Sequence, residues 1–289
     1  MPVVAHLAHG PDAAGERWSQ VLCIAALAVV AAAYGRGVHE LWLRRGAGAV
    51  VSRTRAGSFG AGLLLVAFAL YGPVHELAER SFAGHMVQHM LLMLAAAPLL
   101  AFGGAGLPLL LAVPPSGRRL AARVRASAPV RWLRRPTNLL LAAGGLHSAV
   151  LWFWHLPLPY VAAEKHPAVH GAEHASLLGA AWLLWSTVLS PGVHRVRGPL
   201  AFLSLFATGM PAAALGAVLT LAPRPVYPPG TLAPAAPLRD QQLAGLIMWV
   251  PMDVVMGAVA VTLFLSWLRD LERRHPAGAP SPVAEEVPL

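Results

Sequence analysis

The segment from His85 to Met93 carries the side chains most able to bind a metal. It reads HMVQHMLLM, and two imidazoles and a thioether recur at four-residue steps as His85, His89 and Met93. Residues four apart share one helical face, so these side chains are predicted to form a stripe. The apolar residues that follow, through Phe102, are typical of a membrane span, where a histidine is rarely kept without a function. The first interpretation is a metal site near the membrane surface. The alternative is that both histidines are interfacial and only extend their side chains toward water.

A second histidine pair has the same spacing. His170 and His174 begin another apolar segment, and two histidines four residues apart on a helix can reach one metal ion. His75 at the end of the second apolar segment and His155 at the end of the fourth are further candidate ligands. For His155, which follows two tryptophans, an interfacial aromatic belt is the alternative.

The last apolar segment carries a carboxylate followed by thioethers. Asp240, Met248, Met252 and Met256 fall on one face at multiples of four residues. Thioethers favour Cu(I), so Asp240 and Met248 are predicted as ligands, although methionine also fills apolar cores. Asp253 in the same segment is unusual, because an ionised aspartate at mid-membrane costs about 2.5–3.5 kcal/mol. It is expected to be protonated, paired or in contact with a polar cavity.

Two glutamates and a single cysteine complete the candidate chemistry. Glu76 and Glu173 are close in sequence to predicted ligands and are expected to orient them as hydrogen-bond acceptors. Cys23 is the one cysteine, so the chain has no disulfide framework and no thiolate pair. A metal site must therefore be built from His, Met and carboxylate side chains.

The elements that would position these residues are membrane helices. The 289 residues are 56% hydrophobic and 12% charged, with a mean hydropathy of +0.58, which indicates a polytopic membrane protein without a soluble domain. The predicted fold is all-α, a single domain over 1–289 with a flexible tail at 275–289. The apolar segment 103–115 either extends the third span or re-enters the membrane. The seven predicted spans cover about 18–34, 59–75, 85–103, 138–156, 169–189, 199–222 and 240–268.

The basic residues predict the orientation of these spans. Of the 22 lysines and arginines, 17 fall on one side of a seven-span topology, which places the N-terminus outside and the C-terminus inside. Ten of the 13 histidines then lie in the outer half, and only His39, His194 and His275 lie inside. The net charge of +9 is carried mainly by arginines in short loops, so nucleic acid is not an expected partner.

Distinctive motifs occur at 85–100, 152–160, 170–174, 210–211 and 240–249. Together they resemble one family, the CtaG-type membrane assembly factors of caa-type and related cytochrome c oxidases. The resemblance implies a seven-span protein of the bacterial plasma membrane that helps to deliver copper to an oxidase, and it includes a more distant similarity to copper-resistance proteins. The Gly-x-Pro motif that this family has after the third span is replaced here by the longer sequence GGAGLP at 103–108. The motifs are HMVQHMLLM with PLL after it, WFWHLPLPY at 152–160, HGAEH at 170–174, Met210-Pro211 and DQQLAGLIMW at 240–249.

Other classes of membrane protein are either alternatives or are disfavoured by the sequence. A haem A synthase or a cytochrome b also places histidines on facing helices, but a two-haem bundle needs ligands near both surfaces. A copper resistance or transport protein is a further alternative. A retinal protein is excluded because the one lysine, Lys165, lies in an outer loop. HGAEH is not the HExxH motif of a metal hydrolase, so the protein is not expected to be an enzyme.

The sequence therefore predicts a copper-binding assembly factor whose site is on the outer face of the membrane. Its expected partners are cytochrome c oxidase subunits in the same bilayer and a soluble copper donor on the outer face. A site of imidazole and thioether ligands suits transfer, because it can hold copper without enclosing it fully.

Overall fold

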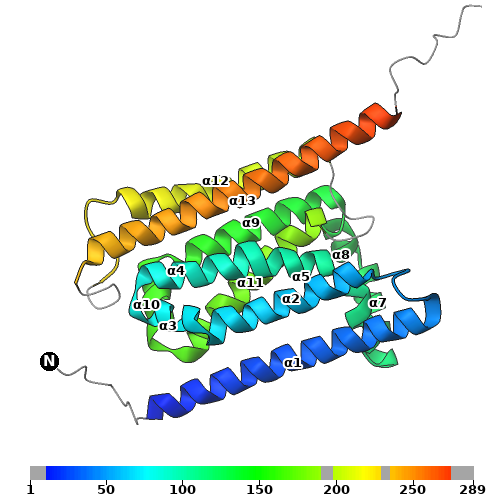
Figure 1. Ribbon diagram of the computed structural model, residues 1–289, viewed down its shortest axis with the longest axis horizontal. Helices are drawn as coiled ribbons and strands as arrows, with labels where there is room; N and C mark the ends of the chain where they lie inside the picture. The colour runs from blue at the N-terminus through cyan, green and yellow to red at the C-terminus, as the bar shows by residue number, and fades with distance from the viewer. Residues whose placement is uncertain (1–10, 190–197, 229–234, 275–289) are drawn as a thin grey trace, which may run out of the picture.

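The computed structural model shows a bundle of long helices (Figure 1). It describes residues 11–189, 198–228 and 235–274, and all regular structure in these ranges is helical, as predicted. His194 and the predicted tail at 275–289 lie outside the described residues.

Each predicted span falls on a helix. By length and apolarity, five segments could cross a membrane, and α9 makes a sixth only together with α10, which follows it at a bend of 71°. Helix α11 has 23 residues but carries several polar groups in its first half, so seven spans stay a prediction. The long segments are α1 Pro11–Arg45, α2 Arg53–Tyr71, α4 Phe82–Met90 with η1 Leu91–Ala96 and α5 Ala97–Gly103, α9 Pro136–Trp154, α11 Pro167–Leu189, α12 Pro199–Leu221 and α13 Pro237–Arg274. The short helices are α3 Pro73–Arg80, α6 Gly106–Ala112, α7 Pro115–Ala126, α8 Ala128–Leu133 and α10 Pro157–Lys165.

The segment α4–η1–α5 runs through the centre of the bundle (Figure 1). Its most apolar stretch is 61% buried, against 17% for α1 and 22% for α2 and α13. One face contributes Met86 and Met93 to a core shared with α9, α11, α12 and α13, and the other contributes Leu92 and Leu100 to a core shared with α1 and α2. This central position explains why the segment can hold buried polar side chains.

The second predicted span ends earlier than expected. Helix α2 ends at Tyr71, and Gly72 is extended with φ −102° and ψ −164°. Pro73 causes this break, because it lacks an amide hydrogen and disfavours helical geometry in the residue before it. His75 therefore lies on the separate helix α3, and not at the end of α2.

The central segment changes its helical geometry after Met90. Leu91–Ala96 is a π-helix, in which each amide bonds five residues back. Pro98 has no amide to offer the carbonyl of Met93, and the indole nitrogen of Trp185 on α11 donates to that carbonyl at 2.9 Å. This bond ties the central segment to α11.

The segment 103–115 does not extend the central helix. Gly104 adopts a left-handed conformation with φ +65°, which favours glycine and ends α5. A new helix, α6, then packs on α1, where Gly37 leaves room for the backbone of Pro108. The extension is excluded, and membrane re-entry remains a prediction.

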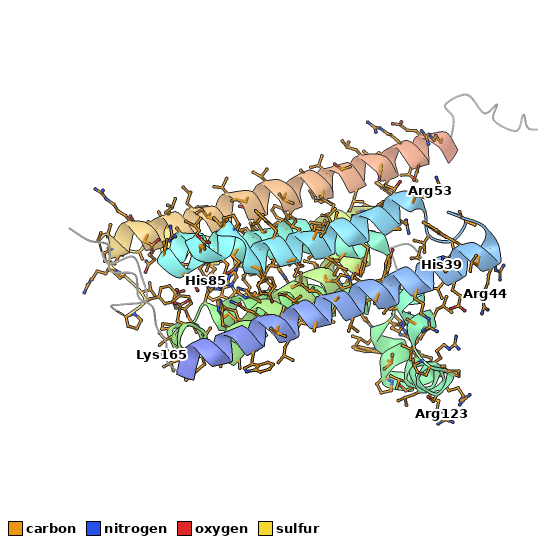
Figure 2. The ribbon with its side chains drawn as sticks, turned by 60° about the horizontal axis from the view of Figure 1, so that its bottom comes forward. His39, Arg44, Arg53, His85, Arg123 and Lys165 are labelled. Atoms are coloured by element: carbon orange, nitrogen blue, oxygen red, sulfur yellow. The ribbon has the colours of Figure 1, made fainter. Side chains whose placement is uncertain are left out.

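The charged residues separate along the bundle axis. Figure 2 shows Arg44, Arg53 and Arg123 at one end of the bundle, and His85 and Lys165 toward the other. This separation agrees with the basic end and the histidine-rich end predicted from the sequence.

Candidate metal centre

Four side chains from two helices meet near one end of the bundle. His85 and His89 on α4 face Glu173 and His174 on α11, and one ligand atom from each lies within 4.8 Å of the others. The rings of His85 and His89 are 4.3 Å apart between centroids, and those of His89 and His174 are 5.3 Å apart. We call these four residues the His/Glu cluster. Three imidazoles and a carboxylate at this spacing can bind one transition-metal ion.

The ligand atoms of the His/Glu cluster are buried without hydrogen-bond partners. Oε1 of Glu173 lies 3.6 Å from Nε2 of both His85 and His89, which is too long for a hydrogen bond. Both carboxylate oxygens, both nitrogens of His89 and Nε2 of His174 are also buried and unpartnered in the described structure. A buried polar atom without a partner costs about 1–3 kcal/mol, so this concentration requires an explanation. A bound cation would satisfy one nitrogen of each imidazole and the carboxylate of Glu173 together.

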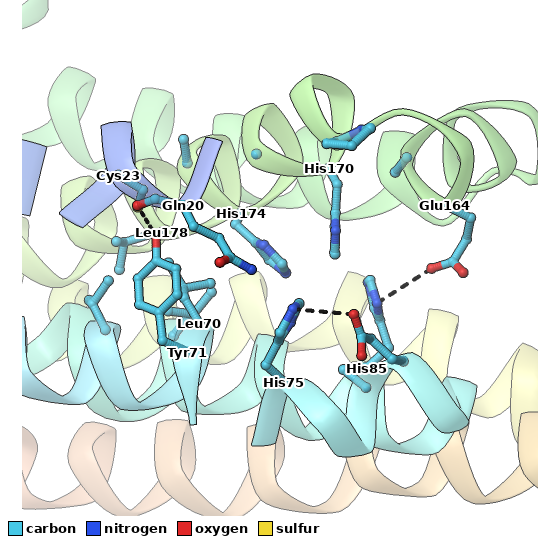
Figure 3. Close-up of a pocket in the computed structure, with 18 of the residues that line it drawn as sticks. Gln20, Cys23, Leu70, Tyr71, His75, His85, Glu164, His170, His174 and Leu178 are labelled. Atoms are coloured by element: carbon cyan, nitrogen blue, oxygen red, sulfur yellow. Dashed lines mark hydrogen bonds and ion pairs between the residues drawn. The ribbon is translucent and has the colours of Figure 1, made fainter. Parts of the chain in front are cut away.

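A cavity of about 630 Å³ opens beside the His/Glu cluster (Figure 3). Residues of α1, α2, α3, α4, α10 and α11 line it. Four histidines point into it: His75, His85, His170 and His174. His170 stacks on His85 at 5.3 Å but is not one of the four clustered ligands. The cavity gives the otherwise buried site an approach from outside the bundle.

Two glutamates on the wall of this cavity were not predicted. Oε1 of Glu164 on α10 lies 3.7 Å from Nδ1 of His85, and Oε1 of Glu79 lies 3.4 Å from Nε2 of His75. Glu79 could have been found from its spacing, because it is four residues after His75 on α3. Glu164 lies in a stretch read as an outer loop, and no sequence signal connects it to His85. Both carboxylates place negative charge where a cation would approach.

His155 is buried next to the His/Glu cluster but already has two partners. Its Nδ1 lies 2.7 Å from the carbonyl of Leu151, and its Nε2 lies 3.3 Å from Sδ of Met86. Its ring centroid is 5.9 Å from that of His89. The hydroxyl of Tyr227 donates to the His155 carbonyl at 3.0 Å, and burial raises the pKa of this phenol, which keeps it protonated. Met86, which was not among the predicted ligands, thus places a thioether beside His155.

Asp240, predicted as a ligand, instead holds the start of α4 in place. Its two oxygens accept hydrogen bonds from the amides of Phe82 and Ala83 at 2.9 and 3.0 Å. The first amides of a helix lack internal partners and carry partial positive charge, so a carboxylate stabilises them. Ser81 accepts from the amide of Gly84 in the same turn. Asp240 therefore positions the helix that carries His85 and His89.

The next residue of the DQQ motif has a related role. Nε2 of Gln241 donates to the carbonyl of Leu219 at 3.2 Å, and its Oε1 accepts from the amide of Val226 at 2.6 Å. It ties the start of α13 to the end of α12. The polar start of α13 thus fixes the helices around the cluster.

The methionines of the two predicted stripes, of which Met93 and Met248 were predicted as ligands, are part of the apolar core. Met93 is fully buried and packs in the core that the central segment shares with α9, α11, α12 and α13. Met248, Met252 and Met256 are at most 3% exposed and pack in the same core. No hydrogen bond in the described residues joins these four side chains to the His/Glu cluster. The core-packing alternative accounts for them.

Glu173 and Glu76 were both predicted to orient ligands, and the structure places them differently. Glu173 is fully buried within the His/Glu cluster and is itself a candidate ligand. Glu76 lies at the surface, 3.5 Å from Arg80, and does not contact a histidine. On a helix it points about 100° away from its neighbour His75, so adjacency in sequence did not bring the two together.

Replacement of Asp240 by alanine is expected to lower the stability of the protein more than its intrinsic affinity for metal. Two buried amides would lose their acceptor, which corresponds to about 2–4 kcal/mol. Asp240→Asn keeps one oxygen acceptor and should lose about half as much. Thermal unfolding in detergent measures the effect, with Asp270→Ala at the exposed far end of α13 as the control. Loss of metal binding at unchanged stability would instead identify Asp240 as a ligand.

The fold and the site define the class of this protein. It is an α-helical protein of membrane type with a buried cluster of three histidines and a glutamate between two central helices. Residues 32–270 match the cytochrome c oxidase caa3 assembly factors (Caa3_CtaG), and the chain belongs to that family. No curated protein and no solved structure matches it.

Proposed function

We propose that this protein binds copper at the His/Glu cluster and delivers it to a cytochrome c oxidase during assembly. The observation that carries the proposal is the set of buried, unpartnered ligand atoms of His85, His89, Glu173 and His174. Membership of the caa3 assembly factor family supports the role in oxidase biogenesis. Copper is the cargo in this proposal, and no catalytic step is assigned to the protein.

The donor set favours copper among the common divalent ions. Sites of nitrogen and oxygen ligands bind Cu(II) more tightly than Zn(II) or the earlier metals of the series. The cluster has no thiolate, so it lacks the donors of a closed structural zinc or iron–sulfur site. The thioether of Met86, beside His155, is a soft donor within the same region. Ligands of this kind can exchange, which transfer to a partner requires.

The geometry supports a single ion more than a haem. A porphyrin is a broad flat ring that must lie between its axial ligands. Here the rings of His85, His89 and His174 pack directly on one another, with centroids 4.3 to 5.9 Å apart. This direct packing leaves no room for a porphyrin between these three rings.

We also propose that the protein spans the membrane seven times and that copper reaches the cluster from the outer face through the cavity. The separation of the arginine-rich end from the cluster supports this orientation (Figure 2). Reporter fusions at the two termini are expected to show an external N-terminus and an internal C-terminus. A C-terminal reporter that is active only outside the cell would place the cluster on the cytoplasmic side and contradict delivery from the outer face.

Metal analysis of the purified protein tests the identity of the cargo. After copper loading and desalting, about one copper ion per chain is expected, because the cluster offers one set of four donors. An absorption spectrum of the same sample should lack a haem Soret band. Zinc retained in preference to copper, or a bound haem, would contradict the proposal.

A further inference from the structure

Asp253 occupies an unusual place in the longest helix. It is the only charged residue between Asp240 and Arg269 on α13. At a rise of 1.5 Å per residue it lies about 20 Å from the first and about 24 Å from the second, so it is near the middle of the apolar stretch. An ionisable side chain at this depth is costly unless it is paired or faces water.

The face that carries Asp253 points away from the bundle. Asp253 is exposed, and the adjacent Val250 and Val254 are 50% and 63% exposed. Its Oδ1 lies 3.8 Å from the position that a Cβ of Gly209 would occupy on α12, so the carboxylate lies over the junction of the two helices. Met210 and Phe206, at 49% and 57% exposed, continue this apolar surface on α12. In a bilayer this surface would face lipid tails or another protein.

A proline interrupts each of the two helices near Asp253. Pro211 and Pro251 lie inside α12 and α13, each two residues from the contact of Gly209 with Asp253. Proline has no amide hydrogen, so the carbonyls four residues before them lose their helical donors. Within the described chain, the carboxylate of Asp253 has no hydrogen bond and no ion pair. A carboxylate without a partner complements a donor group and not another acceptor.

We propose that the α12–α13 face around Asp253 docks a transmembrane helix of the oxidase that carries a basic or amide side chain at mid-membrane depth. This inference rests on the proposed function, since it names the surface by which the copper donor would recognise its recipient. A second copy of this chain fits less well, because a two-fold contact would bring the two Asp253 carboxylates together. Pairing in a low-dielectric interface removes the cost of the isolated charge and fixes the depth of the partner helix.

Photo-crosslinking in intact cells tests the surface. Val254→p-benzoylphenylalanine is expected to form a cross-link with a membrane subunit of the oxidase, identified by mass spectrometry. Leu64 on α2 is the matched control position, because it is 74% exposed but lies on another helix. Asp253→Leu in the same chain should reduce the Val254 cross-link by about tenfold or more, which corresponds to about 1.4 kcal/mol, and Asp253→Asn should reduce it less.

Two further measurements separate this role from a structural one and from copper binding. Asp253→Leu should leave the thermal unfolding midpoint of the purified protein unchanged or raised, because it removes a charge from a lipid-facing surface. Its copper content should equal that of the unchanged protein, whereas a His89→Gln protein should lose copper and still cross-link through position 254. A lowered midpoint with an unchanged cross-link, no oxidase cross-link at position 254, or a cross-link to a second copy of the chain would each overturn the proposal.

Discussion

A protein with both His85 and His89 replaced by glutamine is expected to bind copper at least about a hundredfold more weakly. These residues supply two of the three imidazoles of the His/Glu cluster, and the remaining Glu173 and His174 form an incomplete ligand set. Glutamine is the better replacement because both histidines are buried, and alanine would leave a cavity that destabilises the helix pair. Competition with a chelator of known affinity measures the change.

Replacement of the two histidines of the second pair, His170 and His174, should weaken copper binding to different extents. His174→Gln should weaken copper binding strongly, whereas His170→Gln should weaken it less, because His170 lines the cavity and is not one of the four clustered ligands. The control is His39→Gln, which changes an exposed histidine at the arginine-rich end. If the control loses as much copper as the cluster variants, the loss reflects misfolding and the assignment of the ligands is contradicted.

Cells that lack this protein are expected to lose most activity of the oxidase it serves, and added copper should restore part of it. A raised copper concentration increases occupancy of a weak alternative route by mass action. The same supplement would not replace a missing haem. Respiratory oxidase activity measured over a range of copper concentrations therefore separates copper supply from haem supply.

Complementation links this phenotype to the site. A plasmid copy with His39→Gln should restore activity at low copper, and a copy with His89→Gln should restore it only when copper is added. Both proteins must be present in the membrane at the same level. Full restoration by the His89→Gln protein at low copper would show that the His/Glu cluster is not needed for delivery.

The all-helical fold and the helices that carry the site follow from the sequence because both depend on local patterns. Long apolar segments specify helices, and four-residue spacing identified the His85–His89 and His170–His174 pairs. Three of these four residues belong to the His/Glu cluster. Spacing could not distinguish His170, because residues on one helical face still differ in depth and in the helix that they meet.

The contacts that the predicted side chains make depend on packing between helices, which local patterns do not determine. Met93 follows His89 by four residues, but its side chain packs in the apolar core between the central segment and α9, α11, α12 and α13. Asp240 has the chemistry of a ligand, but the start of α4, far away in sequence, supplies its partners. Met86 and Glu164 reach the site only through tertiary contacts with His155 and His85. Local sequence cannot reveal such partners.

The most direct test of copper delivery is to measure haem and copper together in the oxidase purified from cells that lack this protein. We expect an oxidase that contains its normal haem and little copper, since the His/Glu cluster would supply the metal and not the porphyrin. An oxidase with normal copper but missing or altered haem would contradict copper delivery and favour a role in haem supply.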